Sequence, residues 1–323
     1  MIEIAGMSLI VTDRCNASCR HCGFSAGPGK KSVMPLVQAR EYLQVTNSHK
    51  SALLISYTGG EPFLYYDYLK EIISSAASRG FYGEVVTNSF WADNVTKAQE
   101  ILHDLRTLGV INFVTSLDDF HAEFINPEYV KTAVSIASEL GYNVTVKVTG
   151  LELPGTTYTS ARVKEFLAVP VKNIKIISQY PVPAGRAAEQ AAAGIVGGKK
   201  FRKDVQRQKP YGRCSTVIRF PSINPDGEVY PCCGFGEKHR LLGNTNDTPL
   251  SEILINMQRN LFLNMLAYEG PVKLLDSARA YLRKTPRDDF GNICEACNYI
   301  LGDADVTAAV GRVLKEIMEE RTG

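Results

Sequence analysis

Short apolar runs rich in Val, Ile and Thr alternate with longer amphipathic stretches along the first half of the chain. The apolar runs predict six strands, at residues 7–12, 52–57, 82–88, 110–116, 143–149 and 172–178. Helical periodicity lies between them, near residues 34–47, 65–79, 94–108, 126–140 and 159–168. This alternation predicts a parallel sheet with right-handed crossovers. Six strands are too few for a closed eight-stranded barrel, so we expect an α/β fold built on a partial (β/α)6 TIM-like barrel.

The strand–helix alternation stops near Cys214, after a segment of different composition. Residues 187–198 are rich in Ala and Gly, and residues 199–209 are basic, as is typical of a linker. We therefore expect a barrel at residues 1–190, a linker or lid at residues 191–213, and a small α+β domain at residues 214–323.

Composition narrows the cellular setting. The 323 residues carry a net charge of +2, which gives no argument for a nucleic-acid or membrane partner, and we expect neither. The N-terminus lacks the basic and small-residue features of a signal peptide, and no apolar run is long enough to span a bilayer. We therefore expect a cytoplasmic protein. Thiols stay reduced in the cytoplasm, so the eight cysteines of this chain indicate metal binding or catalysis rather than disulfides.

The first cysteines, Cys15, Cys19 and Cys22, have the spacing C-x3-C-x2-C. Three thiolates on one loop can hold three irons of a [4Fe–4S] cube and leave the fourth iron open to a substrate. The alternative is a zinc site with His21 as the fourth ligand. Further polar or glycine residues follow the predicted strands, as expected where the strands of a parallel sheet end: Thr58-Gly59-Gly60-Glu61, Asn88 and Ser116.

These motifs resemble the radical S-adenosylmethionine (SAM) superfamily. The resemblance implies that the open iron binds SAM and that reductive cleavage gives a 5′-deoxyadenosyl radical. It places Gly59-Gly60-Glu61-Pro62 as the second signature, with Glu61 accepting a hydrogen bond from the SAM ammonium group. It also places Asn88 and Ser116 at the SAM ribose or carboxylate and Lys147 at the carboxylate. His21 stands where the family has an aromatic residue, although an imidazole can still stack on adenine.

The remaining cysteines lie on both sides of a predicted hairpin, with Cys214 before it and the other four after it. Asp226-Gly227 forms its turn and Glu228-Val229-Tyr230 its returning strand. A helix is expected from near Ser251. This region resembles the twitch and SPASM extensions of radical SAM enzymes, which carry auxiliary clusters. The resemblance implies one auxiliary [4Fe–4S] cluster on Cys214, Cys232, Cys294 and Cys297, with a four-cysteine zinc ribbon as the alternative.

Cys233 is left over by that assignment. Neighbouring side chains on an extended segment point in opposite directions, so Cys232 and Cys233 should not both face one cluster, and either could be the ligand. The chain as a whole is similar to the YydG-type peptide epimerases in the following segments: residues 14–22, 58–64, 88–91, 116–121, 226–233 and 293–297.

That similarity implies a ribosomally made precursor peptide as substrate, conversion of an L-residue to a D-residue, and Cys233 as the hydrogen donor. Electrons would come from a flavodoxin or ferredoxin-type donor. Three alternatives stay open: thioether or C–C crosslinking or dehydrogenation of a peptide, epimerisation of a small molecule such as a sugar, and a metal-stabilised binding module.

Overall fold

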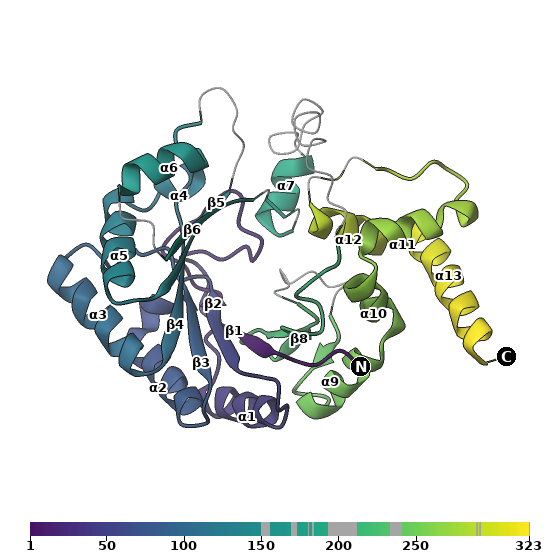
Figure 1. Ribbon diagram of the computed structural model, residues 1–323, viewed down its shortest axis with the longest axis horizontal. Coiled ribbons are helices and arrows are strands. Elements are labelled where there is room, and N and C mark those ends of the chain that lie inside the picture. The colour runs from purple at the N-terminus through teal and green to yellow at the C-terminus, as the bar shows by residue number, and fades with distance from the viewer. Residues whose placement is uncertain are drawn as a thin grey trace.

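A computed structural model describes residues 1–149, 156–168, 173–179, 181–182, 184–192, 212–232, 241–288, 290 and 292–322. Within these residues one sheet of nine strands runs in the order β6-β5-β4-β3-β2-β1-β7-β8-β9. Neighbours among β1 to β6 pair in parallel. The sheet is curved, and the longer helices α1, α2, α3, α5 and α6 cover its outer side (Figure 1). This arrangement confirms the predicted partial barrel.

All six predicted strands are present, with ends that differ by at most two residues: β1 (Gly6–Thr12), β2 (Leu54–Gly59), β3 (Tyr82–Val86), β4 (Val110–Ser116), β5 (Asn143–Thr149) and β6 (Ile174–Gln179). The predicted helices are also confirmed: α1 (Leu36–Asn47), α2 (Tyr66–Ala77), α3 (Val95–Thr107), α5 (Pro127–Glu139) and α6 (Ser160–Leu167). Two short helices, η1 (Pro62–Tyr65) and α4 (Asp119–Ala122), follow β2 and β4.

The burial pattern explains why these segments form a barrel wall. Every residue of β1 is buried, as expected for a central parallel strand that is covered on both faces. The helices place apolar side chains on one face only, as α2 does with Leu69, Ile72, Ile73 and Ala76. Asn side chains cap the first turns of α3 and α5. The loops at the carboxyl ends of the strands are therefore carried on a rigid wall.

The C-terminal half continues the same sheet. β7 (Ser222–Ile223) pairs in parallel with β1, and β8 (Glu228–Tyr230) pairs antiparallel with β7 and β9 (Gly243–Asn244). The predicted hairpin is confirmed, and Gly227 takes the positive φ of +82° that its turn requires. The strands that follow Cys214 are thus bonded directly to the barrel sheet.

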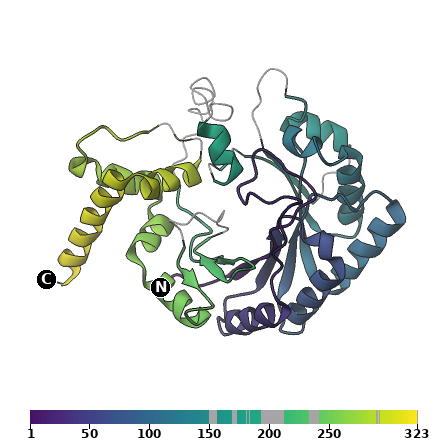
Figure 2. The same ribbon diagram turned by 180° about the vertical axis from the view of Figure 1, so that it is seen from behind.

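Helices α9 (Leu250–Arg259), α10 (Leu261–Tyr268), α11 (Pro271–Ser277), η3 (Arg279–Tyr281), α12 (Ile293–Gly302) and α13 (Ala304–Thr322) complete this half. Both views place them on the opposite side of the molecule from α1 to α6 (Figure 2). Of the expected linker at residues 191–213, residues 193–211 lie outside the described part of the chain. None of the described helices combines the length and the apolar character needed to cross a lipid bilayer.

Candidate functional site

The first three cysteines lie on residues 13–27, which we call the cysteine loop and which follows β1 directly. The loop is folded back on itself, because Cys15 N–H donates to Gly27 O at 3.2 Å and Cys22 N–H donates to Cys19 O at 3.1 Å. The Ala17 N–H points at Cys15 Sγ, 3.4 Å away. All three thiols are free. The loop therefore gathers three sulfur donors at the carboxyl edge of the sheet.

Electrostatics show that these thiols are neighbours. Burial is the main cause that raises the pKa of Cys15 to about 11 and that of Cys19 to about 12, and the charge of Cys22 contributes to each increase. Thiols with pKa values this high ionise near pH 7 only when cations neutralise their charge. Iron supplies such cations, and thiolate is the ligand that iron–sulfur clusters use. The donor set therefore fits a [4Fe–4S] cluster with three protein ligands.

A second loop, residues 59–61, lies against the cysteine loop, and we call it the glycine loop. Gly60 N–H donates to Thr12 O at 2.7 Å, and Glu61 N–H donates to Arg14 O at 2.8 Å. A Cβ at Gly60 would lie 2.2 Å from Arg14 O, and one at Gly59, where φ is +145°, would lie 2.3 Å from Thr12 O. Because these two residues lack a Cβ, the backbone of the glycine loop can lie directly against the backbone of residues 12–14.

Glu61 ties the glycine loop to the end of β3. Its side chain is fully buried, caps η1 by accepting from Phe63 N–H at 3.1 Å, and accepts from Thr87 Oγ1 at 2.9 Å. Its other oxygen accepts from Asn88 N–H at 2.6 Å. Burial raises the pKa of Glu61 to about 7, although these donors favour the charged form. Both carboxylate oxygens already have partners in the chain, and contact with the SAM ammonium group stays a prediction.

Asn88, Ser116 and Lys147 also lie at this edge. The Asn88 side chain donates to Asn16 Oδ1 at 2.8 Å and lies 3.9 Å from Cys15 Sγ, so it reaches the cysteine loop. Ser116 and Lys147 stand opposite each other where β4 pairs with β5. Residues in register on neighbouring strands point to the same face of a sheet. The structure thus pairs Ser116 with Lys147 and joins Asn88 to the cysteine loop.

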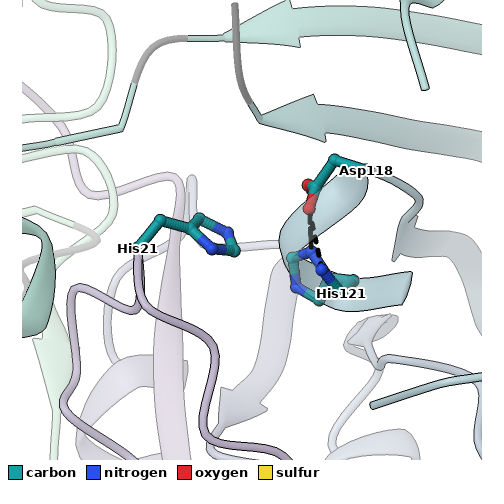
Figure 3. Close-up of side chains that lie close together, drawn as sticks. All are labelled: His21, Asp118 and His121. Atoms are coloured by element: carbon teal, nitrogen blue, oxygen red, sulfur yellow. Dashed lines mark hydrogen bonds and ion pairs between the residues drawn. The ribbon is translucent and has the colours of Figure 1, made fainter. Parts of the chain in front are cut away.

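Beside the cysteine loop, His21, Asp118 and His121 lie close together (Figure 3). Asp118 caps α4 by accepting from the N–H groups of Phe120 and His121, and it also accepts from Thr149 N–H at 3.0 Å. His121 Nδ1 lies 2.8 Å from the same carboxylate. Burial alone would raise the pKa of Asp118, but His121 outweighs it and the pKa is lowered.

The donor atoms of these three residues lie within 4.8 Å of one another, so a metal ion is one possible occupant. A carboxylate has about four lone-pair sites, and Asp118 already accepts from four donors. We therefore assign Asp118 to orienting His121 rather than to metal binding.

His21 itself is held by ring contacts. It stacks on Phe120 with ring centroids 4.7 Å apart and meets His121 edge-on at the same distance. Burial lowers the pKa of His21 to about 4, so the imidazole is neutral near pH 7. Its Nδ1 atom is buried and has no hydrogen-bond partner among the described residues. A buried polar atom without a partner in the chain normally meets a ligand, an ion or a water molecule.

Arg186, at the start of α7 (Arg186–Ala192), was not expected from the sequence. Its N–H donates to Cys22 O at 3.1 Å, and its Nε–H donates to Cys19 O at 3.0 Å. No short motif marks such a residue. Its partners are backbone carbonyl groups, and Cys19 lies 167 positions away in the sequence.

The four cysteines assigned to the auxiliary cluster line one cavity of about 260 Å³, together with apolar side chains such as Leu242, Phe262 and Leu266: Cys214, Cys232, Cys294 and Cys297. Cys294 and Cys297 lie three residues apart on α12 and so share a helix face. Cys232 follows β8, and its carbonyl accepts from Ser222 Oγ at 2.7 Å. A largely apolar cavity with four converging thiols fits a closed, four-cysteine metal centre. Cys233 lies outside the described residues.

Comparison with known proteins agrees with this geometry. Two family models match the chain: the radical SAM superfamily over residues 9–167 and the SPASM iron–sulfur cluster-binding domain over residues 214–298. YydG of Bacillus subtilis (strain 168), which its name assigns to peptide biosynthesis, is 27% identical over 308 residues, which are 93% of this chain and 92% of YydG. The solved structure of anSMEcpe with bound AdoMet matches with a TM-score of 0.52 and 13% identity, over 96% of this chain and 99% of that one. At that identity the match shows a shared fold.

Proposed function

The chain is a radical SAM enzyme with a SPASM domain, and we propose that it converts one L-residue of a ribosomally made peptide into its D-form. A peptide substrate is supported by the similarity to YydG, which spans nearly the whole of both chains. The observation that carries the epimerase proposal is the cavity lined by four cysteines. Four cysteines would complete the auxiliary site, which leaves Cys233 for the role of hydrogen donor.

Two [4Fe–4S] clusters and SAM are the cofactors of the reaction. The cysteine loop would hold the SAM-binding cluster, and the cavity would hold the auxiliary cluster. When bound, the first cluster and SAM supply a 5′-deoxyadenosyl radical, which is able to remove a hydrogen atom from an unactivated carbon. We assign Ser116 and Lys147 to the polar end of SAM, because they lie side by side at the carboxyl edge of the sheet.

The role of Cys233 follows from the chemistry of inversion. Loss of the Cα hydrogen leaves a planar carbon radical, and a hydrogen atom delivered to the opposite face gives the D-residue. The S–H bond of Cys233 breaks as this new C–H bond forms, and the sulfur then regains its hydrogen by taking up one electron and one proton. The Cys233 thiol must be protonated to act, because a thiolate has no hydrogen atom to give.

The electrons would come from a small acidic electron carrier of the flavodoxin or ferredoxin class. Such a donor, and a need for reduced thiols, place the reaction in the cytoplasm.

An isotope experiment tests the proposal. Anaerobically reconstituted protein is incubated in D2O with SAM, dithionite and synthetic all-L peptides taken from open reading frames next to the gene. We expect one solvent deuterium at one Cα, no other change in mass, and one D-residue after hydrolysis and chiral analysis. A product that has lost two hydrogens would instead identify a crosslinking or dehydrogenating enzyme.

The Cys233→Ala variant tests the donor. We expect it to release 5′-deoxyadenosine and form no D-residue, because the hydrogen is still removed but cannot be replaced from the other face. Cys232→Ala is the matched neighbour, and it should lose auxiliary-cluster iron instead. Normal formation of D-peptide by Cys233→Ala would refute the assignment.

A further inference from the structure

Arg186 lies at the start of α7, after the last barrel strand, and holds the cysteine loop. It reaches two carbonyls of that loop, Cys22 O through its backbone N–H and Cys19 O through its side-chain Nε–H. The preceding residue, Gly185, has φ of +52°, and a Cβ there would lie 2.5 Å from Gly23 O and 2.8 Å from Cys22 O. Only glycine lets the chain pass this close to the loop, so the approach of Arg186 is fixed by the backbone.

The Nη2 amino group of this guanidinium is not used. The Nη2 atom of Arg186 is buried and has no hydrogen-bond partner within the described part of the chain. A buried charged donor without an acceptor is costly, so such atoms normally meet a ligand, an ion or water.

The backbone contacts indicate where the acceptor lies. Arg186 bonds to the carbonyl groups of Cys19 and Cys22, which are two of the three residues that would carry the SAM-binding cluster. Its guanidinium therefore lies beside that site. An anionic group bound at those thiols would lie next to the unused donor.

We propose that Arg186 is a positioning residue of the radical-generating centre, which holds the cysteine loop by two carbonyls and donates from its Nη2 amino group to an anionic acceptor of the bound cofactors. The acceptor is either a sulfur atom of the cluster or the carboxylate of SAM. The inference rests on cluster and SAM binding at the cysteine loop and does not depend on which residue of which peptide is modified.

The positive charge has a direct consequence for electron transfer. A [4Fe–4S] centre with three thiolates is anionic and becomes more so when it is reduced. A fixed cation beside it favours the reduced form, because cluster potentials respond to nearby charge and to hydrogen bonds to sulfur. Arg186 therefore makes the cluster easier to reduce.

The test compares Arg186→Gln and Arg186→Lys with the unmodified holoenzyme. The midpoint potential of the SAM-binding cluster is measured by EPR-monitored redox titration without SAM, and the dissociation constant of SAM is measured separately. We expect Arg186→Gln to shift the potential to a more negative value and Arg186→Lys to shift it less. If the acceptor is the SAM carboxylate, the SAM dissociation constant also rises about tenfold or more in Arg186→Gln, as for a lost charge-assisted hydrogen bond. If the acceptor is a cluster sulfur, that constant stays unchanged.

Arg20→Gln is the matched control. Arg20 lies on the same loop, but its side chain is half exposed and paired with Glu123, so solvent screens its charge. We expect neither the potential nor SAM affinity to change in this variant. The proposal is wrong if Arg186→Gln equals Arg20→Gln in both measurements.

Loss of iron from the variants also supports or overturns the proposal. Loss of iron from the SAM-binding cluster alone in Arg186→Gln supports the clamp, and Arg186→Lys then carries the electrostatic comparison. Loss of both clusters with loss of helical circular dichroism in both variants overturns the proposal, because a local clamp leaves the auxiliary site intact.

Discussion

Replacing Gly60 with Ala tests whether close packing of the glycine loop holds the cysteine loop in place. The added Cβ would lie 2.2 Å from Arg14 O, more than 1 Å inside the ordinary contact distance of 3.4 Å, and its nearest neighbours are rigid backbone atoms. Relief requires the two loops to separate, which breaks the Gly60 N–H bond to Thr12 O and the Glu61 N–H bond to Arg14 O. Strain of about 1–3 kcal/mol and two hydrogen bonds of about 1 kcal/mol each give a cost of about 3–5 kcal/mol.

That cost falls on the loop that carries the SAM-binding cluster. After anaerobic reconstitution we expect Gly60→Ala to hold about four irons per chain instead of about eight, because the auxiliary site is unaffected. The urea midpoint of the cluster-free protein should also fall.

Gly29→Ala is the control for this substitution, since Gly29 is exposed on the segment that follows the cysteine loop and an added Cβ there meets no atom within 4 Å. Equal iron content and equal urea midpoints in the two variants would refute the steric argument.

Three further predictions concern charge and ligands. Burial holds the pKa of Glu61 at about 7, above its ordinary value of 4.5, so folding favours the protonated form and stability of the cluster-free protein falls as pH rises from about 4.5 to 7. Glu61→Gln should flatten that part of the stability curve, and an unchanged slope would contradict the assignment. Cys297→Ser should lose about four irons yet still release 5′-deoxyadenosine; retention of all iron would exclude Cys297 as a ligand. Lys147→Met should weaken SAM binding about tenfold by calorimetry, whereas the exposed Lys175→Met should not; equal affinities would remove Lys147 from the site.

The barrel was predictable because its signals are local. Each of β1 to β6 is an apolar run bounded by turn residues, and each helix repeats its buried positions within a few residues. The cysteine loop was predictable for the same reason, since Cys15, Cys19 and Cys22 carry their chemistry in their spacing.

What the sequence does not reveal is how distant segments meet. Arg186 contacts carbonyl groups, which every residue has, so no residue pattern announces the contact. The two residues of β7 are too few to show a strand period, and their pairing with β1 joins segments more than 200 positions apart. Glycine lets the backbone approach a neighbouring group closely, but whether Gly59 and Gly60 pack on a ligand or on Thr12 and Arg14 depends on the path of another loop.

The pairing of β7 with β1 bears on how two hydrogen carriers can act on one carbon. β1 leads directly into the cysteine loop, and the β7–β8 hairpin leads directly to Cys232. Ser8 pairs with Ser222 and Leu9 with Ile223, so β1 and the β7–β8 hairpin belong to one hydrogen-bonded sheet, in which β7 lies between β1 and β8. Inversion requires a hydrogen to leave one face of a carbon and another to arrive at the opposite face, and small displacements of reacting groups cost large factors in rate. A continuous sheet fixes the positions of β1 and the β7–β8 hairpin relative to each other better than a hinge between two independent domains would.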